Sequence, residues 1–229
     1  MTDREHAPSY QLLMLIATPK LADKAAEMFL KSALPIQYRL GAVGTASSEI
    51  MDTLGLGSTD KGVLVSTVPK EFGTAMLRML HSELRLDAVN SGIAFTIPLT
   101  AASKLLVRLM THTAEESRSS HKGKDENAMT ENYALIAAVV NRGFSGEVMD
   151  AARAAGAGGG TVLHSRSIGS EEATGYWGLG VQEEKEIVLI LADAESKAGI
   201  MRAIGEHCGM HSEAKGLVTS LPIDSVMGL

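Results

Sequence analysis

The sequence predicts an α+β protein made of two tandem domains, each with the element order strand, helix, strand, strand, helix, strand. The first observation is an internal repeat: Tyr10-Gln-Leu-Leu aligns with Tyr133-Ala-Leu-Ile at an offset of 123 residues (133 − 10). The second is that both halves alternate between apolar strand-like runs and helix-like spacing of apolar residues. A repeat of this length indicates that one structural unit is used twice.

The repeat is anchored at several points beyond its first strand. The early anchors keep the offset of 123, and one residue is inserted before the last two, which follow at 124. The aligned pairs are Gly55-Leu56-Gly57 with Gly178-Leu179-Gly180, Val63-Leu64-Val65 with Glu186-Ile187-Val188, Gly92 with Gly216, and Pro98 with Pro222.

The domain limits follow from these anchors. We predict one domain at 10–100 and the other at 133–229. Residues 111–132 lie between them, are polar and lack periodicity, and are therefore expected to form a linker.

The same order of elements is predicted in both halves. In the first half, Thr18 and Pro19 are expected to begin a helix as N-cap and first residue. The remaining elements there are strands at 12–17, 35–43, 62–68 and 92–98, a loop at 44–60 and a helix at 70–84. In the second half the strands are 134–140, 160–167, 185–192 and 216–221, the helices 146–155 and 195–208, and the loop 168–184.

This order is that of the ferredoxin-like fold, with an antiparallel sheet and helices on one face. The other face of such a sheet needs a partner if it is apolar. We therefore expect the domains to associate.

Residues 140–166 carry the most distinctive local pattern. Ser145 is expected to cap a helix that Gly156 ends with a positive φ. The run Gly158-Gly159-Gly160 then leaves bare backbone, which a neighbouring chain or a ligand can approach closely.

Several runs in the second half resemble the P-II (nitrogen regulatory) signal-transduction family, in its divergent PII-like branch. Their order and spacing make the resemblance more specific than any single run, and they span most of residues 133–229. The runs are Arg142-Gly143, the helix Glu147–Ala155, Gly156-Ala157-Gly158-Gly159-Gly160-Thr161-Val162, Glu184-Lys185-Glu186-Ile187-Val188-Leu189, and Lys215-Gly216-Leu217 before Leu221-Pro222.

The resemblance implies a regulator of signal transduction rather than an enzyme. Its domains would pack as trimers, and the chain would form a homo-oligomer. An adenine nucleotide (ADP, AMP or ATP) would bind in a cleft between subunits, with no other cofactor. The residues carried over are Gly158, Gly159, Gly160, Thr161, Val162, Arg166, Ser167, Gly169, Lys215 and Gly216.

Two departures from the family pattern bear on the nucleotide. Leu217 stands where typical members have a lysine, and the chain ends without the family's C-terminal arginines. These differences weaken the case for a triphosphate and leave a less charged ligand such as ADP or AMP, or none of these nucleotides, as the alternatives. Arg142 and Arg166 are either cationic contacts or solvated strand ends. The first half has Pro35-Ile36 in place of the glycine run and is interpreted as a degenerate copy.

The loop 168–184 takes the place of the family's partner-binding loop. Tyr176, Trp177 and Gly178 are its candidate contacts with an unknown partner protein, and the alternative is packing on the chain's own subunits. The loop acids, Glu184 among them, are interpreted as a solvated face.

A transition-metal protein of the same fold is the second hypothesis, and a structural assembly protein is the third. The metal hypothesis rests on His207, Cys208, Met210 and His211, which are ligand types that suit zinc, copper or nickel. His207 is also explained by the last turn of a helix, where a positive charge is favourable.

Composition and charge argue against several other classes of protein. The net charge of −6 does not favour nucleic acid as a partner, and no apolar run has the length of a membrane span. Cys208 is the single cysteine, so no internal disulfide forms, and a cytoplasmic location is expected. We find no nucleophile with a base and no pair of acids in a defined frame, so no catalytic activity is predicted.

Overall fold

The computed structural model describes residues 10–32, 34, 37–45, 59–88, 91–103, 106–107, 133–166 and 184–228. The chain divides into two compact units, which we treat separately. Unit 1 contains Met1–Gly41, Lys61–Glu131 and Pro222–Leu229, and unit 2 contains Ala42–Asp60 and Asn132–Leu221.

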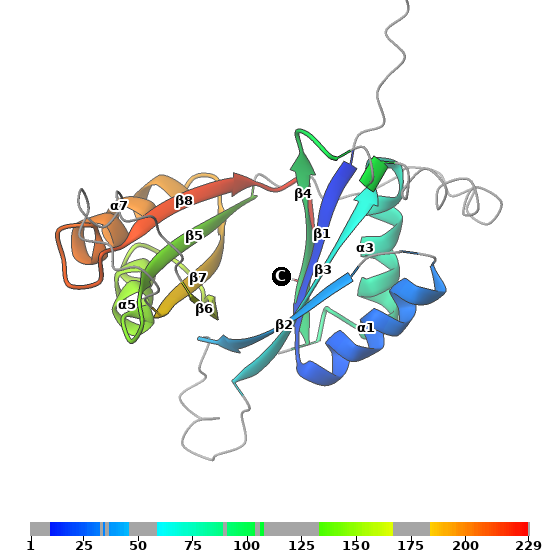
Figure 1. Cartoon of the computed structure of the whole chain (residues 1–229), viewed down its shortest axis with the longest axis horizontal. Helices are drawn as coiled ribbons and strands as arrows, with labels where there is room; N and C mark the ends of the chain where they lie inside the picture. Colours follow the sequence, from blue (N-terminus) through cyan, green and yellow to red (C-terminus); the bar gives the residue numbers. More distant parts are fainter. Residues whose placement is uncertain are drawn as a thin grey trace, which may run out of the picture. The chain divides into compact units, whose positions relative to one another are not determined.

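Unit 1 is built on the first half of the chain. Its strands run antiparallel in the order β3-β1-β4, and the first part of β2 lies beside β3. Two helices, α1 and α3, lie on one face of this sheet (Figure 1). The elements are β1 (Tyr10–Ala17), α1 (Pro19–Lys31), β2 (Gln37–Gly44), β3 (Asp60–Pro69), α3 (Lys70–Leu84) and β4 (Gly92–Leu99).

The core of unit 1 lies between this sheet and its helices. Alternate residues of β1, among them Leu13 and Leu15, point to the helices and are fully buried. They pack with Phe29 of α1 and Leu77 of α3 in one cluster. The period-2 pattern of the strand and the helical spacing of the apolar residues thus meet in one apolar layer.

Unit 2 repeats this arrangement with the second half of the chain. Its strand order is β8-β5-β7-β6, and β5 and β6 both pair antiparallel with β7. The elements are β5 (Tyr133–Asn141), α5 (Ser145–Ala154), β6 (Thr161–Arg166), β7 (Glu184–Asp193), α7 (Lys197–Cys208) and β8 (Leu217–Pro222). Both halves are therefore ferredoxin-like, as predicted, and every predicted strand and helix is present.

The core of unit 2 contains small side chains. Ala138 of β5 and Ala152 of α5 are fully buried together with Val188 of β7 and Ile204 of α7. Alanines at these positions let the helices lie close to the sheet.

The strand registers correct one detail of the repeat. Tyr10 pairs with Pro69 in unit 1, and Tyr133 pairs with Asp193 in unit 2, so β3 and β7 correspond at an offset of 124 (193 − 69). Val63 therefore corresponds to Ile187, not to Glu186. The inserted residue lies before this strand, because both strands of the pair must present their apolar residues to the helices.

Two short segments join the unit formed mainly by the other half. The end of β2 pairs with β6 in unit 2, where Val43 faces Val162 and Gly44 faces Thr161. A further strand that was not predicted, β9 (Ser225–Met227), pairs with β4 in unit 1. The compact units thus differ from the predicted ranges 10–100 and 133–229 at these two places, and the predicted linker 111–132 lies outside the described residues.

Helix ends follow the predictions in part. Pro19 is the first residue of α1 and Thr18 its N-cap, although the Thr18 side chain makes no capping hydrogen bond. Gly156 follows α5 with a φ of +99°, as expected for a residue that ends a helix. The prediction that Ser145 is an N-cap is wrong, because Ser145 is the first residue of α5 and Phe144 precedes it.

Candidate functional site

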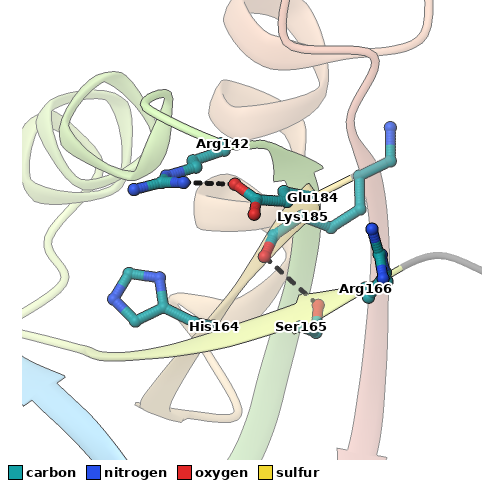
Figure 2. A pocket seen from close by; sticks show the side chains of 6 residues that line it. All are labelled: Arg142, His164, Ser165, Arg166, Glu184 and Lys185. Carbon is teal, nitrogen blue, oxygen red and sulfur yellow. Dashed lines mark hydrogen bonds and ion pairs between the residues drawn. The ribbon is translucent and has the colours of Figure 1, made fainter. Parts of the chain in front are cut away.

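A polar hollow of about 540 Å³ lies at one end of the unit 2 sheet. It is lined by Arg142, His164, Ser165, Arg166, Glu184 and Lys185 (Figure 2). Its volume is in the range of pockets that hold small molecules, and three of its six lining residues, Arg142, Arg166 and Lys185, are cationic.

Three strand ends bring these residues together. Arg142 follows directly after the last residue of β5, Arg166 is the last residue of β6, and Glu184 is the first residue of β7. In the register of β6 with β7, Arg166 faces Glu184 and His164 faces Glu186. The hollow is therefore built on regular strands, and Arg166 and Glu184, the residues on either side of the segment 167–183, both line it.

An ion pair joins two of the lining residues. Arg142 donates a hydrogen bond from Nη1 to Oε2 of Glu184, and both side chains are largely exposed. The hydrogen bond and charge of Arg142 lower the pKa of Glu184, and the charges of Arg166 and His164 act in the same direction. Glu184 is thus a carboxylate surrounded by cationic groups.

The side chain of Lys185 is held by a residue of the neighbouring strand β5. Its Nζ donates to Oδ1 of Asn141 at the end of β5, although the residue is buried. Asn141 is itself held by Glu213, whose carbonyl oxygen accepts a hydrogen bond from Nδ2 of Asn141 at 2.8 Å. The Ser165 hydroxyl donates to the carbonyl oxygen of Lys185 at 3.3 Å. This side of the hollow is therefore preorganised.

Glu186 explains how α5 begins without a side-chain cap. Its Oε2 accepts a hydrogen bond from the backbone N–H of Ser145 at 3.0 Å, and the carboxylate lies where a helix favours negative charge. Burial raises the pKa of Glu186, but hydrogen bonds from Ser145 and Gly143 and the charge of His164 outweigh it, so the pKa is lowered overall. The anion-binding end of α5 is thus occupied by a residue of the protein itself.

The predicted nucleotide residues at the start of β6 lie far from the hollow. Thr161 and Arg166 are the two ends of β6, about 17 Å apart along an extended strand. Gly158, Gly159 and Gly160 precede Thr161, and Val162 is buried in the core. The described members of the predicted set therefore lie at both ends of β6 rather than together. The expected cleft shared with another domain stays a prediction.

The bare backbone of the glycine run is approached by a segment of the same chain. The Thr45 hydroxyl accepts a hydrogen bond from the N–H of Gly160 at 2.8 Å and donates one to its carbonyl oxygen at 2.9 Å. A Cβ on Gly160 would also lie 2.8 Å from Sδ of Met149 in the core. A ligand or a neighbouring chain was predicted to approach here, whereas the structure places Thr45 of the same chain against Gly160, which also has a packing reason of its own.

Lys215 and Gly216 lie near the same end of the sheet as the hollow. Ala214, the residue before them, accepts a hydrogen bond from the N–H of Asn141 at 2.8 Å. The N–H of Gly216, however, donates to the carbonyl oxygen of Cys208 at 2.8 Å. In this structure that amide is used by the fold and does not point to a ligand.

Other predicted residues lie outside the described part of the chain. These are Ser167 and Gly169 of the nucleotide set and Tyr176, Trp177 and Gly178 of the partner-binding loop.

The metal candidates are not gathered into a ligand set. Cys208 is fully buried in the core, and burial raises the pKa of its thiol. His207 contacts the carbonyl oxygen of Ala203, one turn earlier in α7, through Nδ1 at 2.9 Å. Among the described residues no cluster of three or more His, Cys, Asp or Glu side chains could hold a metal ion.

The sequence pointed to part of the hollow only. Arg166 was a predicted contact and Arg142 was considered as one, but Ser165 and Lys185 were missed and Glu184 was interpreted as solvated. The available signal was the alternation Glu184-Lys185-Glu186 at the start of a strand. Its use required the register against β6, which a single sequence does not specify.

Comparisons with known proteins concern the fold. No family model and no curated protein matches the chain. A solved structure of PII from Arabidopsis thaliana bound to citrate is 17% identical, covers 41% of this chain and 77% of that one, and has a TM-score of 0.33. The divalent ion tolerance protein CutA1 from Ehrlichia chaffeensis is 9% identical over 46% of this chain and 95% of that one, at a TM-score of 0.35.

A third similar structure is the periplasmic divalent cation tolerance protein CutA from Archaeoglobus fulgidus, 12% identical over 45% of this chain and 97% of that one, with a TM-score of 0.35. Within the described ranges, none of the helices has the length and apolar character that a membrane crossing requires. The order of helices and strands in the two units makes the chain an α+β protein of two tandem ferredoxin-like halves.

Proposed function

We propose that this protein is a PII-like sensor that binds a small phosphate-bearing effector in its second half and regulates a partner protein. The observation that supports this proposal is the hollow of unit 2, with Arg142, Arg166, Lys185 and His164 in its lining. Arg142 and Arg166 are the groups expected to contact phosphate, because arginine binds phosphate oxygens with two parallel hydrogen bonds. Glu184 offsets one of these charges, so the lining remains cationic.

The effector that we propose is an adenine nucleotide, ADP, AMP or ATP. The volume of about 540 Å³ is sufficient for a small molecule of this class. The phosphate part of the proposal rests on the hollow, and the adenine part rests on the resemblance of the runs around Gly156–Val162 and Glu184–Leu189 to the P-II family.

The proposed regulatory route uses the segment 167–183, which contains most of the predicted partner-binding loop. Arg166 ends β6 and Glu184 begins β7, so both residues that flank this segment also line the hollow. A ligand that contacts these two residues changes the free energy of the segment's ends. An effector site and a partner site that share one element are coupled in this way.

We also propose that the chain is a homo-oligomer. In β2 the side chains of Tyr38 and Leu40 are 64% and 41% exposed, whereas Arg39 between them forms an ion pair with Asp23 of α1 at 2.7 Å. The two apolar side chains therefore lie on the sheet face opposite the helix. Light scattering of the full chain tests this proposal, and a purely monomeric protein at micromolar concentration would contradict it.

The effector proposal is tested by calorimetric titration of the full chain with ADP, AMP, ATP and inorganic phosphate. A ligand that binds only the folded protein also raises the melting temperature. The variant Arg166→Gln should lower the affinity at least tenfold. Arg202→Gln is the matched control, because it removes the same charge from an exposed position of α7.

Two results would refute the effector proposal. One is that none of the phosphate-bearing ligands binds the wild-type chain. The other is that Arg166→Gln binds them as tightly as Arg202→Gln does. Zinc, copper and nickel belong in the same melting experiment, since stabilisation by a metal alone would favour the metal-binding class instead.

A further inference from the structure

We infer that the carboxylate of Glu184 is a built-in competitor of the effector: in the free protein it occupies the position on Arg142 that a phosphate group of the ligand takes on binding. The inference rests on the proposed function, because it concerns the same hollow. It adds the ligand chemistry that the hollow selects and a means by which binding is regulated.

The placement of Glu184 is the first support. It accepts a hydrogen bond from Arg142, and it faces Arg166 across the paired strands β6 and β7. His164 and Lys185 line the same hollow, and in Figure 2 the Glu184 carboxylate points toward Arg142, with His164 on the same side. Among the six lining residues Glu184 is the one acid, and it stands where the surrounding cations most favour an anion.

The exposure of the pair is the second support. The side chains of Arg142 and Glu184 are 66% and 59% exposed, so water competes for both groups. Exposed ion pairs contribute little to stability and exchange readily. Glu184 can turn into solvent when a ligand arrives, and this release costs little because its carboxylate is then hydrated.

A phosphate group is better suited to the place than the carboxylate is. It carries more negative charge and has three acceptor oxygens, whereas Glu184 offers two. It can therefore bond Arg142 while it also faces the other cations of the hollow. Ligands without a charged group have no means to displace Glu184, so the hollow selects anions from neutral molecules of similar size.

The exchange of Glu184 for a ligand phosphate on Arg142 takes place next to the segment 167–183. Glu184 is the first residue of β7 and directly follows the segment 167–183. Release of its side chain from Arg142 alters the bonding at one end of that segment. The ligand signal thus begins at a residue that belongs both to the hollow and to the proposed regulatory route.

The test compares wild type with Glu184→Gln by calorimetric titration of the full chain with inorganic phosphate, ADP, citrate and adenosine at low ionic strength. Glu184→Gln should bind phosphate and ADP about fivefold tighter, a gain of the size expected for the loss of one exposed ion pair. High salt should reduce this gain, because it screens exposed charges. Adenosine, which carries no charged group, should bind both proteins equally. The titration with citrate shows whether a ligand with carboxylate groups also binds Glu184→Gln more tightly than wild type.

Two further variants separate competition from a general effect of charge. Glu195→Gln makes the same change in net charge in the turn after β7, at the other end of that strand, and should leave affinity unchanged. In the double variant Arg142→Gln/Glu184→Gln the gain in affinity for phosphate and ADP should disappear, because the Arg142 guanidinium for which Glu184 and the ligand compete is absent.

The inference is overturned if Glu184→Gln binds phosphate and ADP no tighter than wild type, or if Glu195→Gln gains equally. A lower melting temperature of Glu184→Gln with unchanged affinity would show a purely structural pair and would also overturn it. If wild type still binds phosphate or ADP in these cases, the proposed function stays intact. If neither wild type nor the variant binds any of the anions, both the proposed function and the inference are refuted.

Discussion

Gly216 offers the sharpest test of the packing in unit 2, through the substitution Gly216→Ala. A Cβ at this position would lie 2.1 Å from the carbonyl oxygen of Cys208 and 3.3 Å from Cγ1 of Val140. Ordinary contacts of a Cβ begin at 3.4 Å, so the backbone must move by more than 1 Å. This movement breaks the hydrogen bond from the Gly216 N–H to Cys208.

The expected loss of stability has two parts. The broken hydrogen bond costs about 1 kcal/mol. Overpacking against a rigid helix end costs about 1–3 kcal/mol more. We therefore expect Gly216→Ala to lower the free energy of unfolding by roughly 2–4 kcal/mol, with the lower value if the loop between Gly209 and Gly216 relaxes.

The assay is urea unfolding of the full chain, followed by far-UV circular dichroism. Gly205→Ala is the matched control, since Gly205 lies within α7 and nothing is within 4 Å of its added Cβ. The control should gain about 1 kcal/mol from helix propensity. If Gly216→Ala unfolds at the wild-type urea midpoint with the same m-value, the close approach to Cys208 is refuted.

Three further outcomes are expected. Thr45→Val removes the hydroxyl that bonds both polar groups of Gly160 and should lower unfolding stability by about 1–2 kcal/mol; an unchanged urea midpoint would contradict the docking of the β2 end on β6. The pKa of Glu186 is lowered in the folded protein, so the stability that this carboxylate contributes is complete above its unfolded-state pKa and is lost as the pH falls through its folded-state pKa. Glu186→Gln should therefore flatten the decrease of melting temperature at acid pH. A decrease as steep as that of wild type would refute this role. Arg85 ends α3 in the left-handed region with a φ of 52°, and Arg85→Gly should raise stability by about 1 kcal/mol; a decrease would show that the arginine side chain contributes more than its backbone strain costs.

The repeat, the element order and most element bounds could be predicted because they depend on local patterns. Continuous apolar runs mark β1 and β5, and helical spacing marks α3, which was predicted at its observed limits of 70–84. Gly156 could be predicted as a helix end, because the need for a positive φ is a property of one residue. Arg166 was the part of the candidate site that the sequence indicated directly.

Tertiary structure alone decided which distant segments meet. Period-2 patterning tells which face of a strand is apolar but not which strand will lie beside its edge, so the pairing of β9 with β4 and of the β2 end with β6 could not be predicted. The same limit applies to the hollow: Arg142 and Glu184 are 42 positions apart, and their ion pair depends on the registers of β5 and β6 with β7. The sequence shows which residues are charged. It does not show which side chain will neutralise each of them, because strand edges all carry the same backbone groups and only the three-dimensional packing decides which strands pair.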